Sequence, residues 1–140
     1  MTPKDLSIDD ITIGDFAFFE VEIREEDIIN FAKISGDYNP LHLDENYASK
    51  TQFGNRIVHG MYLGSLVSRL VGMELPGKRA LLIKESLEFK KPVFIADKLI
   101  IRGTIITKSQ TTGLIELAID IKQGTEILVT GSVYARILNL

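Results

Sequence analysis

The stretch HGMYLGSLVSRLVGME, residues 59–74, decides the fold of this chain. It is apolar on nearly all sides over about four helical turns, which is typical of a helix that is buried all round. Small residues recur at every fourth position, at Gly60, Gly64, Ser68 and Gly72. This stripe allows either a sheet or a bound ligand to approach the helix backbone closely. The sequence LPG at residues 75–77 then ends the helix.

Alternating apolar residues predict β-strands on both sides of this helix. One strand is expected at residues 16–23, and others follow the helix at 80–89, 98–108 and 114–122. A last strand, after a turn at residues 123–125, is expected to direct one set of side chains inward: Ile127, Val129, Val133, Ala135 and Ile137. One buried helix beside an antiparallel sheet predicts an α+β architecture, with the sheet curled around the helix and the strands after the helix forming a meander.

The opposite face of that sheet is predicted to be partly apolar, which bears on the oligomeric state. Its apolar residues are Leu114, Ala118, Leu128, Tyr134 and Leu138. Strand edges that nothing covers are open to pairing with a second chain. We therefore expect an oligomer, most simply a two-fold dimer.

The composition describes a globular domain of ordinary size and narrows the classes of partner. The 140 residues are 45% hydrophobic and 25% charged, and their net charge of −3 argues against nucleic acid as a partner. Cysteine is absent and only two histidines occur, so we expect no disulfide, no thiol nucleophile and no metal site. The N-terminal segment has no signal-peptide pattern and no apolar run suits a membrane span, so a cytoplasmic protein without a membrane partner is expected.

A second informative stretch is SGDYNPLH, residues 35–42. A helical pattern runs up to it, and Gly36 can take a positive φ to end that helix, while Pro40 disfavours a helical residue before it. Asp37 and His42 then lie on a rigid turn, where their side chains can converge as an acid and a base for proton transfer. Gly, Asp, Asn and Pro are also common in turns that are purely structural.

The motif IVHGM, residues 57–61, favours the functional interpretation. It holds the one histidine besides His42, and it opens the long apolar helix, where backbone N–H groups are free to bind an anion. Both histidines of the chain therefore lie in compact motifs.

These segments together resemble the MaoC-like, or type 2, enoyl-CoA hydratases, a family that includes the bacterial (R)-specific enoyl-CoA hydratases. The resemblance is carried by FAKISGDYNPLH at residues 31–42 with Ala48 downstream, IVHGM at 57–61, the LPG helix stop at 75–77 and FKKPV at 89–93. It implies a single hot-dog domain over residues 1–140 and a homodimer or a dimer of dimers. It also implies reversible addition of water to a trans-2-enoyl-CoA, which gives the (R)-3-hydroxyacyl-CoA, and we expect no cofactor.

The resemblance further implies roles for individual residues. Asp37 and His42 would hold one water that supplies the hydroxyl to C3 and the proton to C2 of the substrate. The Gly60 N–H would donate to the thioester oxygen, and such a donor is typically worth about 100- to 1000-fold in rate. Three more residues are candidates for substrate binding, each with a structural alternative. Asn39 could instead hold the turn, and His59 could instead brace it. Ser68 could line an acyl pocket or form a hydrogen bond near Asp37 or His42, and its structural alternative is a place in the small-residue stripe.

Three alternatives remain open at this point. A dehydratase acting on acyl-carrier-protein thioesters would use the same chemistry with a different carrier. Hot-dog thioesterases place a carboxylate on or near the central helix, but no acidic residue precedes Glu74 on this one. A non-catalytic acyl-binding domain would lack the Asp or the His of the turn, and both are present. Hydration or dehydration of a thioester is therefore the favoured interpretation.

Overall fold

The computed structural model describes all 140 residues of the chain. It contains five β-strands, four α-helices and one short 3-10 helix. In chain order these are η1 (Ile8–Asp10), β1 (Phe16–Glu22), α1 (Glu25–Ser35), α2 (Pro40–Leu43), α3 (Glu45–Ser49), α4 (Gly60–Met73), β2 (Ala80–Phe89), β3 (Lys98–Lys108), β4 (Leu114–Gln123) and β5 (Glu126–Ile137). No helix among them is both long enough and apolar enough to cross a membrane.

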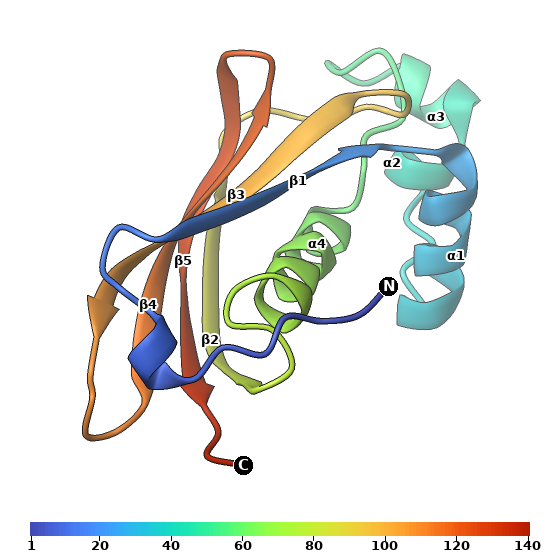
Figure 1. The fold of residues 1–140 in the computed structure, drawn as a ribbon. Helices are drawn as coiled ribbons and strands as arrows, with labels where there is room; N and C mark the ends of the chain where they lie inside the picture. Colours follow the sequence, from blue (N-terminus) through green and yellow to red (C-terminus); the bar gives the residue numbers. More distant parts are fainter.

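The five strands form one antiparallel sheet in the order β1-β3-β4-β5-β2. Helix α4 packs against one face of this sheet, and α1 lies on the far side of α4, so the sheet, α4 and α1 form successive layers (Figure 1). This is a hot-dog arrangement of the α+β class. The architecture expected from the sequence is therefore confirmed.

Strand β2 occupies a different place from the predicted one. We expected all four strands after α4 to form a meander, but only β3, β4 and β5 do so, because β2 pairs with β5 at the edge of the sheet. The connection from β2 to β3 runs beside the segment before α4, where the Val58 N–H donates to the Val93 carbonyl at 2.8 Å. This crossing brings residues 89–93 next to the start of α4.

Alternation along the inner strands builds the core as predicted. Strand β4 buries every second residue, and β3 buries its inward set against the apolar side of α4. The buried residues of these two strands are Leu99, Ile101, Ile105, Ile115, Leu117, Ile119 and Ile121. Because their side chains fill the space between sheet and helix, the start of α4 is held at a fixed position over the sheet.

Strand β5 departs from simple alternation near its start. The pairing of β4 with β5 shifts register there, and Leu128 is left as an extra residue in β5. Leu128 is buried and Ile127 is 42% exposed, so the expectation that Ile127 points inward and Leu128 outward is wrong. A one-residue bulge reverses the alternation of a strand without changing its apolar composition, so the sequence pattern does not reveal it.

The extra residue also anchors the connection after β2. The Leu128 carbonyl accepts hydrogen bonds from the N–H groups of both Lys90 and Lys91, at 2.9 and 3.2 Å. The bulge in β5 therefore fixes the position of the segment that follows β2.

Two glycines of the small-residue stripe, Gly60 and Gly64, face β2. A Cβ on Gly60 would lie 3.0 Å from the Phe89 ring, and a Cβ on Gly64 would lie 2.9 Å from the Glu85 carboxylate. Glycine therefore lets β2 approach the helix backbone at these two positions. The sheet is therefore a neighbour of the stripe at Gly60 and Gly64, as one of the two expectations had it.

The outer side of α4 is not covered by the rest of the protomer. Met61, Ser65 and Ser68 are exposed on it. The expectation of a helix buried on all sides is therefore wrong for this side, because the sheet and α1 together enclose only part of the circumference of the helix.

Candidate active site

The turn after α1 holds Asp37 by local hydrogen bonds. Helix α1 ends at Gly36, which has φ of +78° as predicted and donates its N–H to the Ala32 carbonyl at 2.9 Å. The Asp37 N–H donates to the Ser35 hydroxyl at 3.1 Å, and Asp37 Oδ1 accepts the Asn39 N–H at 3.1 Å. This bond leaves Oδ2 of the carboxylate without a hydrogen-bond partner in the chain.

Asn39 holds the turn in this structure. Its side-chain oxygen accepts the Leu41 N–H at 2.9 Å and thereby caps α2, a short helix that begins at Pro40 and that the sequence did not predict. Pro is favoured at the first position of a helix, because the N–H it lacks would have no partner there. Of the two roles considered for Asn39, this contact supports the structural one.

His42 lies on α2 with its two ring nitrogens in different surroundings. Its Nδ1 lies 2.7 Å from the Ile57 carbonyl oxygen, an acceptor, so Nδ1 carries the proton of the neutral ring. Nε2 then has a free lone pair. A histidine fixed in this tautomer by a backbone carbonyl is suited to accept a proton from water.

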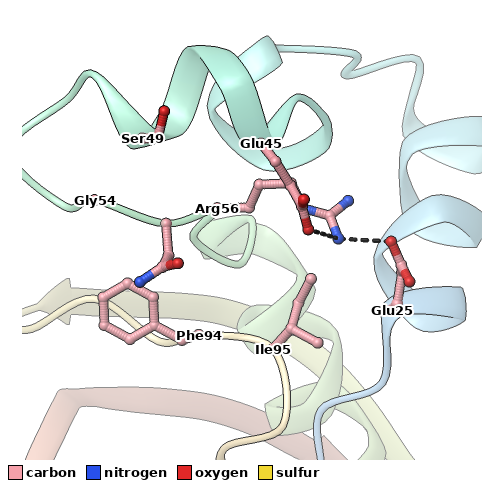
Figure 2. A pocket seen from close by; sticks show the side chains of 8 residues that line it. Glu25, Glu45, Ser49, Gly54, Arg56, Phe94 and Ile95 are labelled. Carbon is pink, nitrogen blue, oxygen red and sulfur yellow. Dashed lines mark hydrogen bonds and ion pairs between the residues drawn. The ribbon is translucent and has the colours of Figure 1, made fainter.

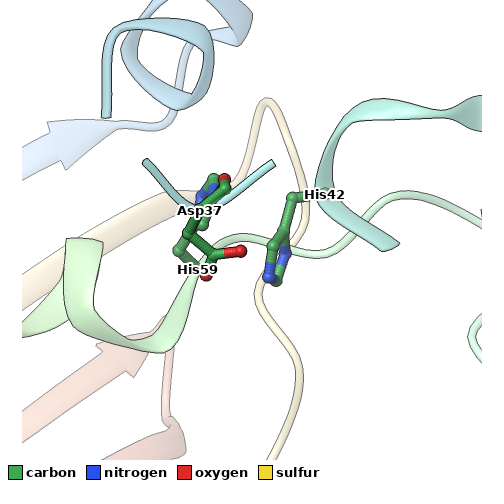
Figure 3. Close-up of side chains that lie close together, drawn as sticks. All are labelled: Asp37, His42 and His59. Carbon is green, nitrogen blue, oxygen red and sulfur yellow. The ribbon is translucent and has the colours of Figure 1, made fainter. Parts of the chain in front are cut away.

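His59 contacts both catalytic candidates. It immediately precedes α4, is only 2% exposed, and its Nε2 lies 3.0 Å from the Asp37 carbonyl oxygen. Its ring stacks on that of His42 with centroids 3.9 Å apart, and the edge of Phe31 packs on it at 5.0 Å. Figure 3 shows Asp37, His42 and His59 side by side, and ligand atoms of the three lie within 4.8 Å of one another. His59 therefore joins the motif at 57–61 to the turn at 35–42.

The ring geometry does not favour a shared metal ion, although a carboxylate and two imidazoles are common ligands of transition metals. Imidazole nitrogens bind a metal along lone pairs that lie in the ring plane. The planes of His42 and His59 are stacked at an angle of 29°, so their lone pairs run alongside each other and do not converge on one point. We therefore propose no metal at these residues.

Gly60 lies at the wall of a cavity that His42 also lines. The cavity has a volume of about 350 Å³, and its walls include His42, Gly60, Leu63, Phe89, Lys90 and Val93. The N–H groups of Gly60 and Met61 have no acceptor within the chain, as expected for the first residues of a helix. The cavity thus places a base, His42, and one free backbone donor, the Gly60 N–H, around one space.

Ser68 lies apart from this group. It is exposed on α4, two turns beyond Gly60, or about 12 Å along the helix axis. The chain contains no hydrogen bond from Ser68 to Asp37 or His42. Of the functional roles considered for Ser68, the acyl pocket therefore stays a prediction, beside the structural alternative of a small residue in the stripe.

Sequence reasoning gave no role to Phe89, whose ring covers Gly60 and forms part of the cavity wall. Phe89 begins the segment FKKPV at residues 89–93, which is one of the stretches that carry the family resemblance. Nothing in the sequence indicated, however, that β2 pairs with β5 and brings this segment to α4. The partner of an edge strand depends on tertiary packing, which single-sequence patterns do not report.

A larger cavity, about 570 Å³, lies elsewhere and is lined mainly by polar residues, with Phe94 and Ile95 among its walls (Figure 2). Arg56, whose side chain is 9% exposed, donates to Glu25 at 2.6 Å and lies 3.7 Å from Glu45. These ion pairs connect the starts of α1 and α3 to the segment before α4. We assign this cavity a structural role and not a binding role, because its one buried cation, Arg56, already forms ion pairs with Glu25 and Glu45.

Burial of His59 predicts a pH-dependent stability. Desolvation, the main cause, lowers the pKa of His59 below its ordinary value, and the nearby His42 lowers it further. The unfolded chain binds this proton near the ordinary value of about 6.5, so the free energy of unfolding falls as the pH drops below that value. We expect His59→Asn to show a smaller loss of stability than wild type between pH 7.5 and 5.5 in urea unfolding. Equal losses would contradict a neutral buried His59.

Comparisons with known proteins find relatives over most of the chain. The profile of the MaoC like domain matches residues 12–125. The chain is 35% identical over 133 residues to an (R)-specific enoyl-CoA hydratase of Aeromonas caviae, covering 94% of this chain and 99% of the relative. It is 33% identical over 132 residues to a 3-hydroxybutyryl-CoA dehydratase of Methylorubrum extorquens, covering 94% of this chain and 84% of the relative.

The solved structure of an R-hydratase from Pseudomonas aeruginosa superposes with a TM-score of 0.92 at 30% identity, covering 99% of this chain and 89% of the other. The match of the domain profile thus spans most of the chain, and relatives of similar length match it nearly end to end. The chain therefore belongs to the family of MaoC-like domain proteins.

Proposed function

We propose that the protein is a hydro-lyase that adds water reversibly to trans-2-enoyl-CoA and forms (R)-3-hydroxyacyl-CoA. The observation that carries this proposal is the arrangement around the 350 Å³ cavity. The Asp37 carboxylate and the His42 imidazole come from one turn, and the free Gly60 N–H at the start of α4 lies on the same cavity as His42. Similarity to hydratases and a dehydratase over most of the chain supports it.

The chemistry follows from what each group can hold. A water between Asp37 and His42 Nε2 loses a proton to this pair while its oxygen bonds to C3 of the enoyl thioester. The electron pair of the C2–C3 double bond moves toward the thioester carbonyl, and the Gly60 N–H stabilises the oxygen as it becomes enolate-like. The proton held by the pair then passes to C2. The reverse sequence eliminates water.

Lys90 and Lys91 lie at the wall of the cavity and indicate where the carrier of the thioester binds. Both lysines are about half exposed, and their ammonium groups pair with Glu88 and Glu126. Phosphates of coenzyme A or of a phosphopantetheine arm would meet these cations as they leave the cavity. The reaction is the same on an acyl-carrier-protein thioester, so the assay below includes that carrier.

The test is hydration of crotonyl-CoA, followed as the loss of enoyl-thioester absorbance. We expect rapid loss with purified protein and an (R) configuration in the isolated product. If the absorbance falls with a crotonyl acyl-carrier protein and not with crotonyl-CoA, the protein is instead a dehydratase that acts on carrier-protein thioesters. Release of free thiol, detected with a thiol reagent, would instead indicate a thioesterase, and no reaction with either thioester would favour an acyl-binding domain.

We further propose that two copies pair through the outer edge of β2. This strand has only one neighbour in the sheet, and three of its apolar residues are exposed, Leu81, Leu82 and Ile83, at 47%, 40% and 50%. An edge strand with exposed apolar side chains is suited to pair with its own copy about a two-fold axis.

Sedimentation velocity tests this pairing. We expect wild type to sediment as a dimer or a dimer of dimers, and Ile83→Lys to shift the protein toward the monomer because it places a charge at the pairing edge. Ile106→Lys, at an exposed apolar residue of β3, is the matched control and should leave the oligomer unchanged. A monomeric wild type would contradict the pairing.

A further inference from the structure

His59 is a polar ring in a buried place, and only one of its two nitrogens has a partner. The side chain is 2% exposed, and Nδ1 is buried without a hydrogen-bond partner. Nε2 faces the Asp37 carbonyl oxygen, which can only accept, so Nε2 carries the proton of the neutral ring. An unpaired buried polar atom destabilises the folded protein, so an apolar ring would fill this place at a lower cost. The bond to Asp37 is therefore what an imidazole adds here.

This hydrogen bond is the one that joins the turn of Asp37 to a distant part of the chain. All other hydrogen bonds of residues 35–39 stay within residues 31–42, so they connect the turn only to α1 and α2. Residues 35–39 are also exposed, so apolar packing does little to hold them. The position of the Asp37 carboxylate relative to the rest of the site therefore depends on His59.

The segment that contains His59 also holds the other groups of the site. The Ile57 carbonyl accepts the proton of His42 Nδ1 at 2.7 Å. His59 follows two residues later and stacks on the His42 ring, and Gly60 with its free N–H comes directly after it. Residues 57–60 thus form one short segment that sets the positions of the imidazole, the carboxylate and the donor for the thioester oxygen relative to one another.

We propose that His59 is a positioning residue, whose Nε2–H holds the Asp37 carbonyl and so keeps the Asp37 carboxylate where it shares one water with His42 Nε2. This inference rests on the proposed hydration of enoyl thioesters and adds a residue to its machinery. In this role His59 exchanges no proton with the water. Misplacement of a reacting group by about 1 Å can cost about 100-fold in rate, so the loss of this one bond should be visible in kcat.

Two substitutions separate the donor of His59 from its ring. His59→Phe keeps a flat ring beside His42 and Phe31 and removes the donor. We expect kcat for crotonyl-CoA hydration to fall by about tenfold to 100-fold with little change in KM, because the Asp37 carboxylate acts on the water and not on the thioester. His59→Gln removes the ring but keeps an N–H donor near the position of Nε2, and it should restore most of the lost kcat.

Tyr62→Phe is the matched control for these variants. Tyr62 also packs edge-on against Phe31, with ring centroids 5.8 Å apart, and the change removes a polar group beside the same aromatic ring. It leaves the turn of Asp37 untouched, so its kcat should equal that of wild type. Thermal unfolding is recorded for all three variants, so that kcat is compared only between folded proteins.

A measurement on wild type tests the contact without any variant. The chain has two histidines, so a long-range proton–nitrogen NMR spectrum contains two ring systems, which are assigned from the backbone. Burial lowers the pKa of His59, so its ring is neutral at about pH 7.5. We expect this ring to carry its one proton on Nε2, the nitrogen that faces the Asp37 carbonyl.

The outcomes separate this inference from the proposed function. A His59 ring protonated on Nδ1, a His59→Phe enzyme as fast as wild type, or a folded His59→Gln enzyme as slow as His59→Phe overturns the positioning role and leaves the hydratase intact. A wild type that hydrates no enoyl thioester overturns the proposed function and the inference together. The NMR spectrum requires neither activity nor a variant that folds, so it can refute the inference by itself.

Discussion

Asp37→Asn is expected to lower kcat for crotonyl-CoA hydration by about 100- to 10,000-fold, the range for loss of a general acid or base. The amide occupies the same volume as the carboxyl group but cannot take a proton from water. Its oxygen can still accept the Asn39 N–H, so the turn that ends α1 keeps its geometry. The measurement is steady-state hydration together with thermal unfolding, which should change little.

Asp44→Asn is the matched control for this variant. Asp44 undergoes the same change of charge, and its side chain likewise accepts a backbone N–H, that of Tyr47 at 3.0 Å, but it caps α3 and is not part of the cluster of Asp37, His42 and His59. Its activity should stay within about twofold of wild type. An Asp37→Asn enzyme within tenfold of wild type would remove Asp37 from the role of base.

His42→Ala is expected to lower kcat over a similar range, because it removes the imidazole whose Nε2 lone pair faces the water. The truncation also leaves the Ile57 carbonyl without its partner at 2.7 Å and takes away the ring that stacks on His59. Some loss of stability is therefore expected beside the loss of activity, and the two effects must be separated.

Added imidazole distinguishes the loss of catalysis from the loss of stability. The truncated site keeps its cavity, so free imidazole can enter and accept the proton in place of the missing side chain. We expect the rate of His42→Ala to rise with imidazole concentration and to level off, while wild type does not respond. A variant that unfolds at assay temperature would not recover, and a loss smaller than tenfold without imidazole would exclude His42 as the base.

Features that depend on short-range chemistry were predictable from the sequence. The end of α1 at Gly36 and the convergence of Asp37 and His42 follow from Gly, Asp and Pro within one turn. The free donors at the start of α4 follow from the position of Gly60 at the first residue of an apolar helix. In each case the residues that determine the geometry are neighbours in the chain.

Features that depend on long-range packing were not predictable in the same way. His59 is 17 positions from His42 in the chain, and the stacking of their rings results from the way that α2 and the start of α4 meet. The bulge at Leu128 shifts the parity of β5, and the pairing of β2 with β5 places Phe89 over Gly60.

The carbonyl of Leu128 has a consequence for the engineering of this enzyme. Because it accepts the N–H groups of both Lys90 and Lys91, the start of β5 is hydrogen-bonded directly to the rim of the cavity. Substitutions in the hairpin at residues 123–127 can therefore affect the positions of Lys90 and Lys91, without altering a residue that touches the reacting atoms. A library of variants confined to that hairpin can change how the protein binds the carrier of the thioester, while Asp37 and His42 stay unchanged.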